Sequence, residues 1–202
     1  MKLYYSPGAC SLSPHIVACE AGIPIELVKV DLGSKRTETG EDFLPLNPNG
    51  YVPVLTLDEG KKLTEGPAIV QYLADLVPDK NLAPPAGSFE RYELQQWLNF
   101  ISTEIHKSFS PLFRPSAPES TKQFVIETLM ARMETTAAHL SVHPYLLGDN
   151  FSVADAYLFV TLGWGQYVNV DISQWPVLVG YRDKITQRPA VQKAMKEEGL
   201  IK

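Results

Sequence analysis

The sequence predicts an α/β domain followed by an all-helical domain. Over residues 1–77, short β-branched and aromatic runs alternate with a helical pattern and are separated by Gly, Pro and Asn. Residues 78–87 have the Pro, Gly and polar composition of a linker. In residues 88–202, apolar side chains recur every three or four positions, which indicates helices. We therefore expect domains at residues 1–77 and 88–202.

The first domain is predicted to have the order βαβ-ββα. Gly22 ends the first helix, and the strands on either side of this helix are expected to be parallel. A turn at 58–60 favours a hairpin between the last two strands, and Pro67 lies in the first turn of the helix that follows. The expected elements are a strand at 2–5, a helix at 11–21, strands at 25–30, 52–57 and 62–64, and a helix at 66–76.

The Val52-Pro53 bond lies near the start of one of these strands. Proline cannot donate a hydrogen bond to a sheet, so it indicates an edge or a turn. Only about 5% of X-Pro bonds are cis, and sequence physics alone predicts a trans bond here.

The second domain is predicted to begin with Ser88 as the N-cap of a long helix that reaches Phe109. Asn99, Thr103 and His106 form a polar stripe on this helix beside its apolar stripe. The further expected helices run from Glu119 toward Pro144, from Ser152 onward, from Pro176 to Gln187 and from Pro189 to Glu198. Asp155 stands three residues after Ser152, which is the spacing of a capping box and predicts a structural role.

Composition limits the class of partner. The chain has 202 residues, 45% hydrophobic residues and a net charge of −5, without a Lys/Arg cluster to offset the acidic balance. This argues against a nucleic acid or an anionic membrane as partner and favours a small molecule. The N-terminus carries no long apolar run of the signal-peptide kind, so we expect a cytoplasmic protein.

Cys10 lies where the first strand passes into the first helix. Unpaired backbone N–H groups and the positive end of the helix dipole favour a thiolate there, which predicts a reactive cysteine with a lowered pKa. The alternative is a small buried hydrophobe. Cys19, nine residues further along the helix, would lie roughly 13 Å away, beyond disulfide reach.

The segment Cys10-Ser11-Leu12-Ser13 has the form of a thioredoxin-type C-x-x-C motif whose second cysteine is Ser13. Without a resolving thiol, Cys10 is predicted to form a mixed disulfide with a small external thiol instead of an internal disulfide.

The whole chain resembles a cytosolic glutathione transferase, specifically the bacterial beta class. The resemblance rests on Tyr5, residues 6–11, Lys35, Asn47-Pro48, Val52-Pro53, Glu65-Gly66, Asn99, residues 103–107 and the helix start at Asp155. It implies a thioredoxin-like N-terminal domain that binds glutathione, a helical domain that forms the electrophile pocket, a cis Pro53 and a homodimer. Glutathione would then be a co-substrate, with no cofactor.

The resemblance also implies the site residues. The implied catalytic residues are Cys10, Ser11, His106 and Tyr5. The implied glutathione-binding residues are Cys10, Lys35, Val52, Pro53, Glu65, Gly66, Asn99, Thr103, Glu104, His106 and Lys107. Many relatives have Ser where this chain has Gly66, so the helix would offer a backbone N–H but no hydroxyl. Tyr5, Ser11 and His106 all remain candidates for the residue that activates the glutathione thiol.

Two other groups of side chains have weaker patterns. Phe109, Phe113, Trp164 and Tyr167 suit an apolar co-substrate pocket. His139 and His143 have the i, i+4 spacing of metal ligands but lack an evident third ligand, so we expect no metal site and interpret them as cations near a helix C-terminus.

Three functions are compatible with these residues. The first is detoxification by conjugation of the glutathione thiolate to small apolar electrophiles, with secondary thiol–disulfide exchange through Cys10. The alternatives are a glutathione-dependent thiol oxidoreductase and a protein that binds apolar ligands without turnover.

Overall fold

The computed structural model describes residues 1–58 and 60–202. Glu59, in the predicted turn at 58–60, lies outside the described residues. The chain forms two compact units: an N-terminal unit of residues 1–82 and 187–202, and a helical unit of residues 83–186. Residues 187–202 thus group with the N-terminal unit, although the sequence pattern placed them in the helical domain.

The N-terminal unit contains a mixed sheet. Its central strand β1 is parallel to β2 and antiparallel to β4, and β5 is antiparallel to β4, in the order β3-β2-β1-β4-β5. The parallel pair confirms the predicted βαβ unit. The two-residue strand β3 was not predicted, because a pair of residues in a polar loop shows no alternation. The strands are β1 (Lys2–Tyr5), β2 (Glu26–Asp31), β3 (Arg36–Thr37), β4 (Val54–Thr56) and β5 (Lys62–Thr64).

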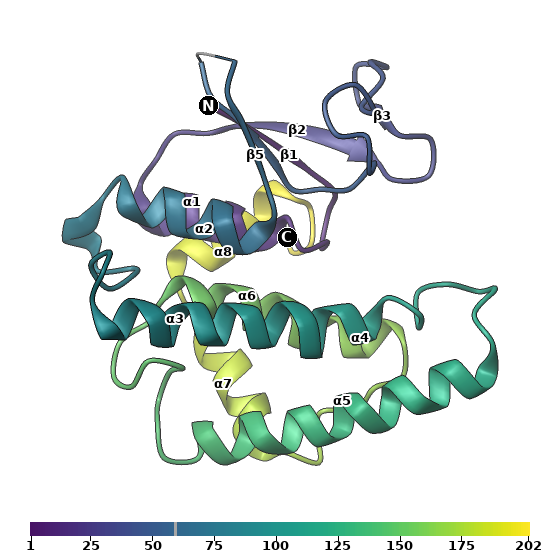
Figure 1. The fold of residues 1–202 in the computed structure, drawn as a ribbon, viewed down its shortest axis with the longest axis vertical. Coiled ribbons are helices and arrows are strands. Elements are labelled where there is room, and N and C mark those ends of the chain that lie inside the picture. Colours follow the sequence, from purple (N-terminus) through teal and green to yellow (C-terminus); the bar gives the residue numbers. More distant parts are fainter. Residues whose placement is uncertain (59) are drawn as a thin grey trace. The chain divides into compact units, whose positions relative to one another are not determined.

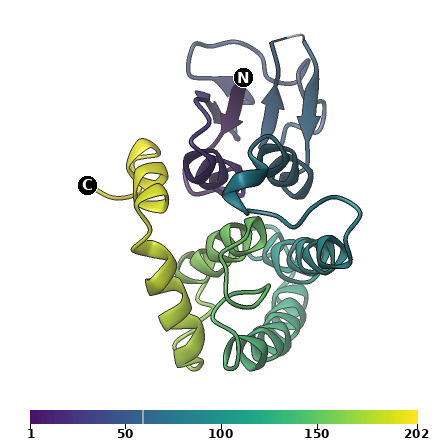
Figure 2. The same cartoon turned by 90° about the vertical axis from the view of Figure 1, so that its left-hand side faces the viewer.

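Three α-helices accompany this sheet: α1 (Leu12–Ala21), α2 (Gly66–Asp75) and α8 (Pro189–Glu197), with a short 3₁₀ helix η1 (Pro78–Lys80) after α2. α1 and α2 lie side by side on one face of the sheet, and α8 packs against α1 (Figures 1 and 2). Gly22 ends α1 as predicted, with a φ of 69° that favours glycine. The core between sheet and helices is apolar; Leu3, Ile16, Leu55 and Ile69 are fully buried.

The Val52-Pro53 peptide bond is cis. Here the expectation from the family resemblance is confirmed, and the expectation from X-Pro statistics is wrong.

The helical unit consists of α3 (Phe89–Phe100), a π-helix η2 (Ile101–His106), α4 (Lys107–Phe109), α5 (Glu119–Leu140), α6 (Val153–Gly163), a 3₁₀ helix η3 (Trp164–Tyr167) and α7 (Pro176–Thr186). Ser88 caps α3 as predicted, since its Oγ accepts a hydrogen bond from the Arg91 N–H at 3.2 Å. The predicted long helix runs through α3, η2 and α4, but its middle part has π geometry. Such π segments occur frequently at functional sites.

α6 is the central helix of this unit, and every residue from Val153 to Leu162 is buried. An almost wholly apolar helix of this kind can only be stable inside a core. Among the residues that the structure describes, no helix combines the length and apolar character needed to cross a membrane.

Candidate functional site

Cys10 lies in the loop between β1 and α1, next to the cis peptide bond. Its S–H donates a hydrogen bond to the Val52 carbonyl oxygen at 3.2 Å. The start of α2 adjoins the same bond, because a Cβ atom on Gly66 would lie 3.9 Å from Pro53 Cγ. Cys10, Val52, Pro53 and Gly66 therefore lie close together, although Cys10 is 42 residues from Val52 in sequence.

The ionisation of Cys10 differs from the sequence-based expectation. Burial raises the pKa of its thiol to about 12; the negative charge of Glu65 adds to this, while the backbone N–H groups of Cys10 and Ser11 lower it only in part. The predicted lowering of the pKa by the helix N-terminus is therefore wrong. Cys10 is a protonated thiol near neutral pH, and it acts as a hydrogen-bond donor.

Ser11 and Tyr5, two of the predicted catalytic residues, are buried. The Ser11 hydroxyl accepts a hydrogen bond from the Ser6 N–H at 3.1 Å and donates one to the Ser6 carbonyl at 3.2 Å, so it holds the loop before α1. The ring of Tyr5 lies 6.4 Å from the ring of His15, and burial, with the charge of Glu198, raises its pKa. The phenol thus stays protonated.

Two charged residues flank the segment that ends in the cis bond. Lys35 Nζ donates a hydrogen bond to the Gly50 carbonyl at 3.0 Å and lies 5.8 Å from the centre of the Tyr51 ring. Glu65 is exposed and directly precedes α2. The N-terminal unit thus presents one cation, one carboxylate and one helix N-terminus around Val52-Pro53.

His106, at the end of the π-helix, lies among aromatic side chains of the helical unit. Its Nδ1 is 2.6 Å from the Tyr157 hydroxyl, and its ring centre is 4.7 Å from that of Trp164. Burial, followed by the positive charge of Lys107, lowers the pKa of His106 to about 4. The imidazole is therefore neutral at physiological pH.

The other predicted residues on this stretch differ in their surroundings. Glu104 Oε2 accepts a hydrogen bond from Arg132 Nε on α5 at 2.6 Å, so its charge is paired within the helical unit. Thr103 donates to the Asn99 carbonyl at 3.0 Å. Thr103, Asn99 and Lys107 are exposed.

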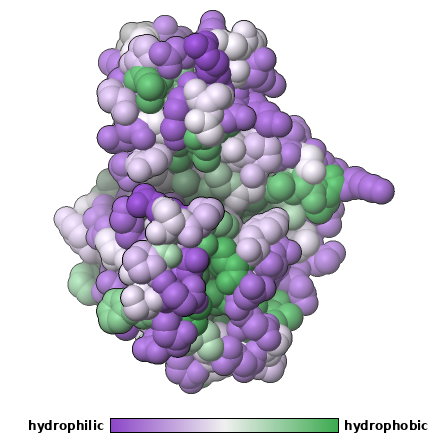
Figure 3. Space-filling model, turned by 90° about the vertical axis from the view of Figure 1, so that its right-hand side faces the viewer, coloured by the Kyte–Doolittle hydropathy of each residue, from purple (hydrophilic) through white to green (hydrophobic). Residues whose placement is uncertain are grey.

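Three of the four predicted pocket aromatics cluster beside His106. The rings of Phe109, Phe113 and Trp164 lie 5.7 to 6.5 Å apart. Phe113 is 48% exposed, which gives the cluster an accessible side. Tyr167 is 64% exposed on η3. Apolar surface is visible on the helical unit in Figure 3.

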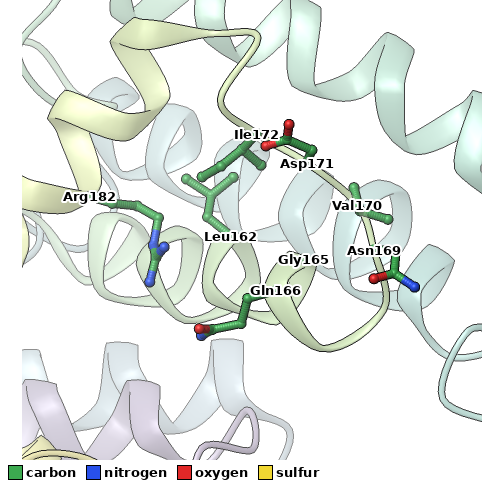
Figure 4. A pocket seen from close by; sticks show the side chains of 8 residues that line it. All are labelled: Leu162, Gly165, Gln166, Asn169, Val170, Asp171, Ile172 and Arg182. Carbon is green, nitrogen blue, oxygen red and sulfur yellow. The ribbon is translucent and has the colours of Figure 1, made fainter.

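Two cavities in the helical unit are lined by residues outside the predicted site. One of about 360 Å³ lies between α6, η3 and α7, and Gln166, Asp171 and Arg182 are among its lining residues (Figure 4). The other, of about 340 Å³, includes His139 and His143, whose rings stack at 4.4 Å. Burial lowers the pKa of His139, so its predicted role as a cation is wrong.

Sequence reasoning missed two side-chain partnerships. Tyr157 is 51 residues from His106, and no sequence spacing links them. His15 and Cys19, by contrast, are four residues apart on one helix, and that spacing could have indicated a shared contact. Both lie near Glu197 of α8.

The comparisons with known proteins cover nearly the whole chain. Residues 8–76 match the family described as glutathione S-transferase, N-terminal domain, and residues 100–189 match its C-terminal domain. "Glutathione S-transferase GstA" of Escherichia coli O157:H7 is 46% identical over 200 residues, which cover 99% of this chain and 100% of that protein.

Solved structures that resemble this chain are also glutathione S-transferases. A sphingomonad glutathione S-transferase complexed with glutathione has a TM-score of 0.96 and 49% identity, with 100% of each chain covered. A beta-class glutathione S-transferase of Sphingomonas chungbukensis has a TM-score of 0.96 and 48% identity, again with 100% of each chain covered.

Proposed function

Because the chain belongs to the glutathione S-transferase family and is structurally close to its bacterial beta class, we propose that it conjugates the glutathione thiolate to small apolar electrophiles. The observation that carries this proposal is the grouping of Cys10, Val52-Pro53 and the start of α2, with Lys35 and Glu65 beside it. This grouping offers charges and backbone donors that complement a small zwitterionic thiol.

Charge matching assigns the ends of glutathione to the N-terminal unit. The tripeptide carries one amino group and two carboxylates. Glu65 supplies a carboxylate for the amino group, Lys35 supplies an ammonium, and the N–H groups of Gly66 and Val52 supply donors for the carboxylates and the backbone. Because Gly66 leads α2, the dipole of that helix favours an anion at this point.

Calorimetry of glutathione binding tests this assignment. We expect Glu65→Gln and Lys35→Ala each to weaken binding about tenfold, which corresponds to about 1.4 kcal/mol, since each removes one charge-assisted hydrogen bond. Lys80→Ala is the matched control, because Lys80 is an exposed lysine of the same unit. Unchanged affinity in both site variants would show that the placement is wrong.

The thiolate of glutathione needs hydrogen-bond donors. Cys10 is a candidate, because its protonated S–H can turn from the Val52 carbonyl to a ligand. His106 is a second candidate: in the tautomer whose Nδ1 accepts from the Tyr157 hydroxyl, the neutral ring carries its proton on Nε2 and can donate it. The remaining predicted residues, Asn99, Thr103, Glu104 and Lys107, stay predictions.

The activity test uses an aryl halide with glutathione, followed by absorbance, beside a disulfide-exchange assay and an apolar-dye binding assay. Conjugation that saturates with both substrates supports the proposal. Exchange without conjugation would favour an oxidoreductase, and dye binding without either activity would favour a binding protein.

We also propose that Cys10 carries out secondary thiol–disulfide exchange. The Cys10 thiolate attacks the glutathione sulfur of a small glutathionylated disulfide, forming the Cys10–glutathione disulfide and releasing the other half as a thiolate. A glutathione thiolate then attacks this mixed disulfide, which forms oxidised glutathione and returns Cys10 to its reduced form, so the net reaction reduces the small disulfide. Ser13 occupies the place of a resolving cysteine, so a second external thiol is required.

We further propose a cytoplasmic homodimer with a detoxifying role, which uses glutathione as co-substrate and no cofactor. The exposed aromatic side chains of Phe89 and Tyr92 on α3 offer apolar surface for a second copy. Sedimentation equilibrium distinguishes a dimer from a monomer, and Phe89→Ser with Tyr92→Ser should shift the equilibrium toward monomer.

A further inference from the structure

The face of α1 that is turned toward α8 carries a group of three residues that can bind a metal. His15 and Cys19 are one helical turn apart, and Glu197 lies at the end of α8. One nitrogen, sulfur or oxygen atom from each of the three lies within 4.8 Å of the other two. His15 Nε2 is 2.8 Å from Glu197 Oε2, and Cys19 Sγ is 4.0 Å from the same oxygen.

Glu198 fixes the orientation of the His15 ring. Its fully buried side chain places Oε1 3.0 Å from His15 Nδ1, while its Oε2 accepts a hydrogen bond from the Gly8 N–H at 2.9 Å. A histidine that binds a metal usually donates its other ring N–H to a carboxylate in this way, which fixes the tautomer and the ring plane. Nε2 is thereby directed at Cys19 and Glu197.

We propose that His15 Nε2, Cys19 Sγ and Glu197 Oε2 bind one Zn²⁺ ion, with water as the fourth ligand. Imidazole, thiolate and carboxylate are the ligands that Zn²⁺ takes in proteins. Ideal tetrahedral bonds would set nitrogen and oxygen about 3.3 Å apart and sulfur and oxygen about 3.6 Å apart. The present distances of 2.8 and 4.0 Å therefore need changes of only about 0.5 Å.

The burial of the three side chains suits this assignment. The His15 side chain is 1% exposed, and its Nδ1 is held by the Glu198 carboxylate. The Glu197 side chain is 41% exposed, and Cys19 is half-buried. An ion and its water can thus reach the site from solvent on the Cys19 and Glu197 side. The rigid ligand is the buried one, and the two adaptable ligands lie at the rim.

The charge balance of the group also fits a divalent ion. The carboxylates of Glu197 and Glu198 lie 2.8 and 3.0 Å from the two ring nitrogens of His15, so the group offers negative charge to a cation. Metal ligands bind in their deprotonated forms, and any protons that the imidazole and the thiol carry are released to solvent when Zn²⁺ binds.

Metal titration of the whole protein tests the proposal. The protein is freed of metal with EDTA, the chelator is removed, and Zn²⁺ is titrated at pH 8 in competition with a chromophoric indicator. Glutathione is left out because its thiol binds Zn²⁺. We expect one Zn²⁺ per chain, a thiolate-to-metal absorption band when Co²⁺ is used, and a higher Tm with Zn²⁺, since the folded state brings the three ligands together and binds the ion more tightly than the unfolded chain.

Variants at the two rim ligands identify the site, because the loss of buried His15 could also unfold the protein. Cys19→Ala and Glu197→Gln should each weaken Zn²⁺ binding on the order of 100-fold and remove the gain in Tm. Cys10→Ala and His143→Ala are matched controls, since they remove the other cysteine and a histidine of the His139/His143 pair.

Two results would each overturn the proposal. The first is that the wild-type protein binds no Zn²⁺ at micromolar concentrations. The second is that binding survives Cys19→Ala but is lost in Cys10→Ala or His143→Ala, which would place the ion elsewhere. In either case the group would be a buried ion pair that joins α1 to α8.

Discussion

At the scale of single residues, two opposing effects act on the Cys10 thiol. The start of α1 offers backbone N–H groups and a favourable dipole, which the sequence already reveals. Burial, which the sequence does not reveal, removes water from around the thiolate, and this destabilises the thiolate more than the backbone N–H groups stabilise it. The balance makes Cys10 a neutral donor at pH 7 and limits its use as a nucleophile.

This balance predicts how Cys10 reacts with oxidised glutathione. Only the thiolate attacks, and with a pKa of about 12 its fraction rises tenfold per pH unit. We expect the rate of mixed-disulfide formation to rise about tenfold per unit between pH 7 and 9, as measured by intact-mass spectrometry.

Peptide mapping should place the adduct on Cys10 and not on Cys19. Cys10→Ala should abolish exchange yet leave substantial conjugation, because glutathione supplies its own nucleophile. A rate that is flat above pH 7 would mean that the thiol is already ionised. Loss of conjugation in Cys10→Ala with glutathione still bound would make Cys10 essential to both reactions.

His106 gives the clearest pH dependence of stability. Its pKa is about 4 in the folded protein and about 6.5 when unfolded, so as the pH falls the imidazole of the unfolded chain is protonated before that of the folded protein. The free energy of unfolding should therefore fall as the pH drops from 6.5 to 4, by up to about 1.4 kcal/mol per pH unit from this residue.

Urea unfolding of wild type and His106→Gln at several pH values isolates this contribution. The difference between the two proteins should change below pH 6.5 and stay constant above it. A difference that changes between pH 7 and 9 instead would show that His106 does not titrate as described.

At the scale of elements, the strands and helices with several turns or clear alternation were predictable. Strands β1, β2, β4 and β5 and the long helices follow from apolar periodicity. The π-helix η2 was not predictable, because residues 101–106 have the composition of an ordinary α-helix and only the hydrogen-bond pattern differs. The cis bond at Pro53 came from the family resemblance, since local statistics favour trans.

The candidate site was predictable to a similar degree. The approach of Cys10 to Val52 follows once the family is recognised, whereas the Tyr157 partner of His106 depends on how α6 packs. Long-range packing leaves little trace in a single sequence. Burial, which sets the pKa of both Cys10 and His106, could not be read from it either.

Asp155 shows how one residue stabilises a helix start. Its Oδ2 accepts hydrogen bonds from the Ser152 N–H and Oγ–H, and its Oδ1 accepts from the Leu146 N–H and the Tyr181 hydroxyl, all within 2.9 Å. Burial raises the pKa of Asp155, whereas these bonds favour the carboxylate. The predicted structural role thus extends from the capping box to the loop before α6 and to α7.

We expect Asp155→Ala to lower the free energy of unfolding by about 3 kcal/mol, because it leaves several buried donors without acceptors. Asp149→Ala is a matched control at an exposed aspartate of the same loop and should be nearly neutral. Both are measured by urea denaturation. If Asp155→Ala were fully stable but inactive, Asp155 would act in the site and not in the fold.

At the scale of the whole molecule, the last helix, α8, belongs to the N-terminal unit. α8 packs on α1, and its Val191 and Ala194 are fully buried. Arg188 binds the Glu20 carboxylate through two hydrogen bonds of 2.6 and 3.0 Å. A boundary drawn by composition alone cannot detect this, because the apolar face of a short terminal helix does not show which unit it covers.

Removal of residues 188–202 should therefore destabilise the N-terminal unit, although the deleted segment follows the helical unit in sequence. It would expose the face of α1 that α8 covers and leave buried His15 without both carboxylate partners. We expect amide exchange in α1 to accelerate and glutathione affinity to fall at least tenfold, because Cys10 and Ser11 directly precede α1. Exchange in α6 should change little.

Arg188→Ala serves as the milder control, since it removes one ion pair and keeps α8. It should raise exchange in α1 only slightly, because a single partly exposed pair contributes about 1 kcal/mol or less. A truncated protein with unchanged exchange in α1 and full glutathione affinity would show that residues 1–82 fold without α8. The boundary at residue 77 expected from composition would then describe an independent folding unit, and α8 would only cover it.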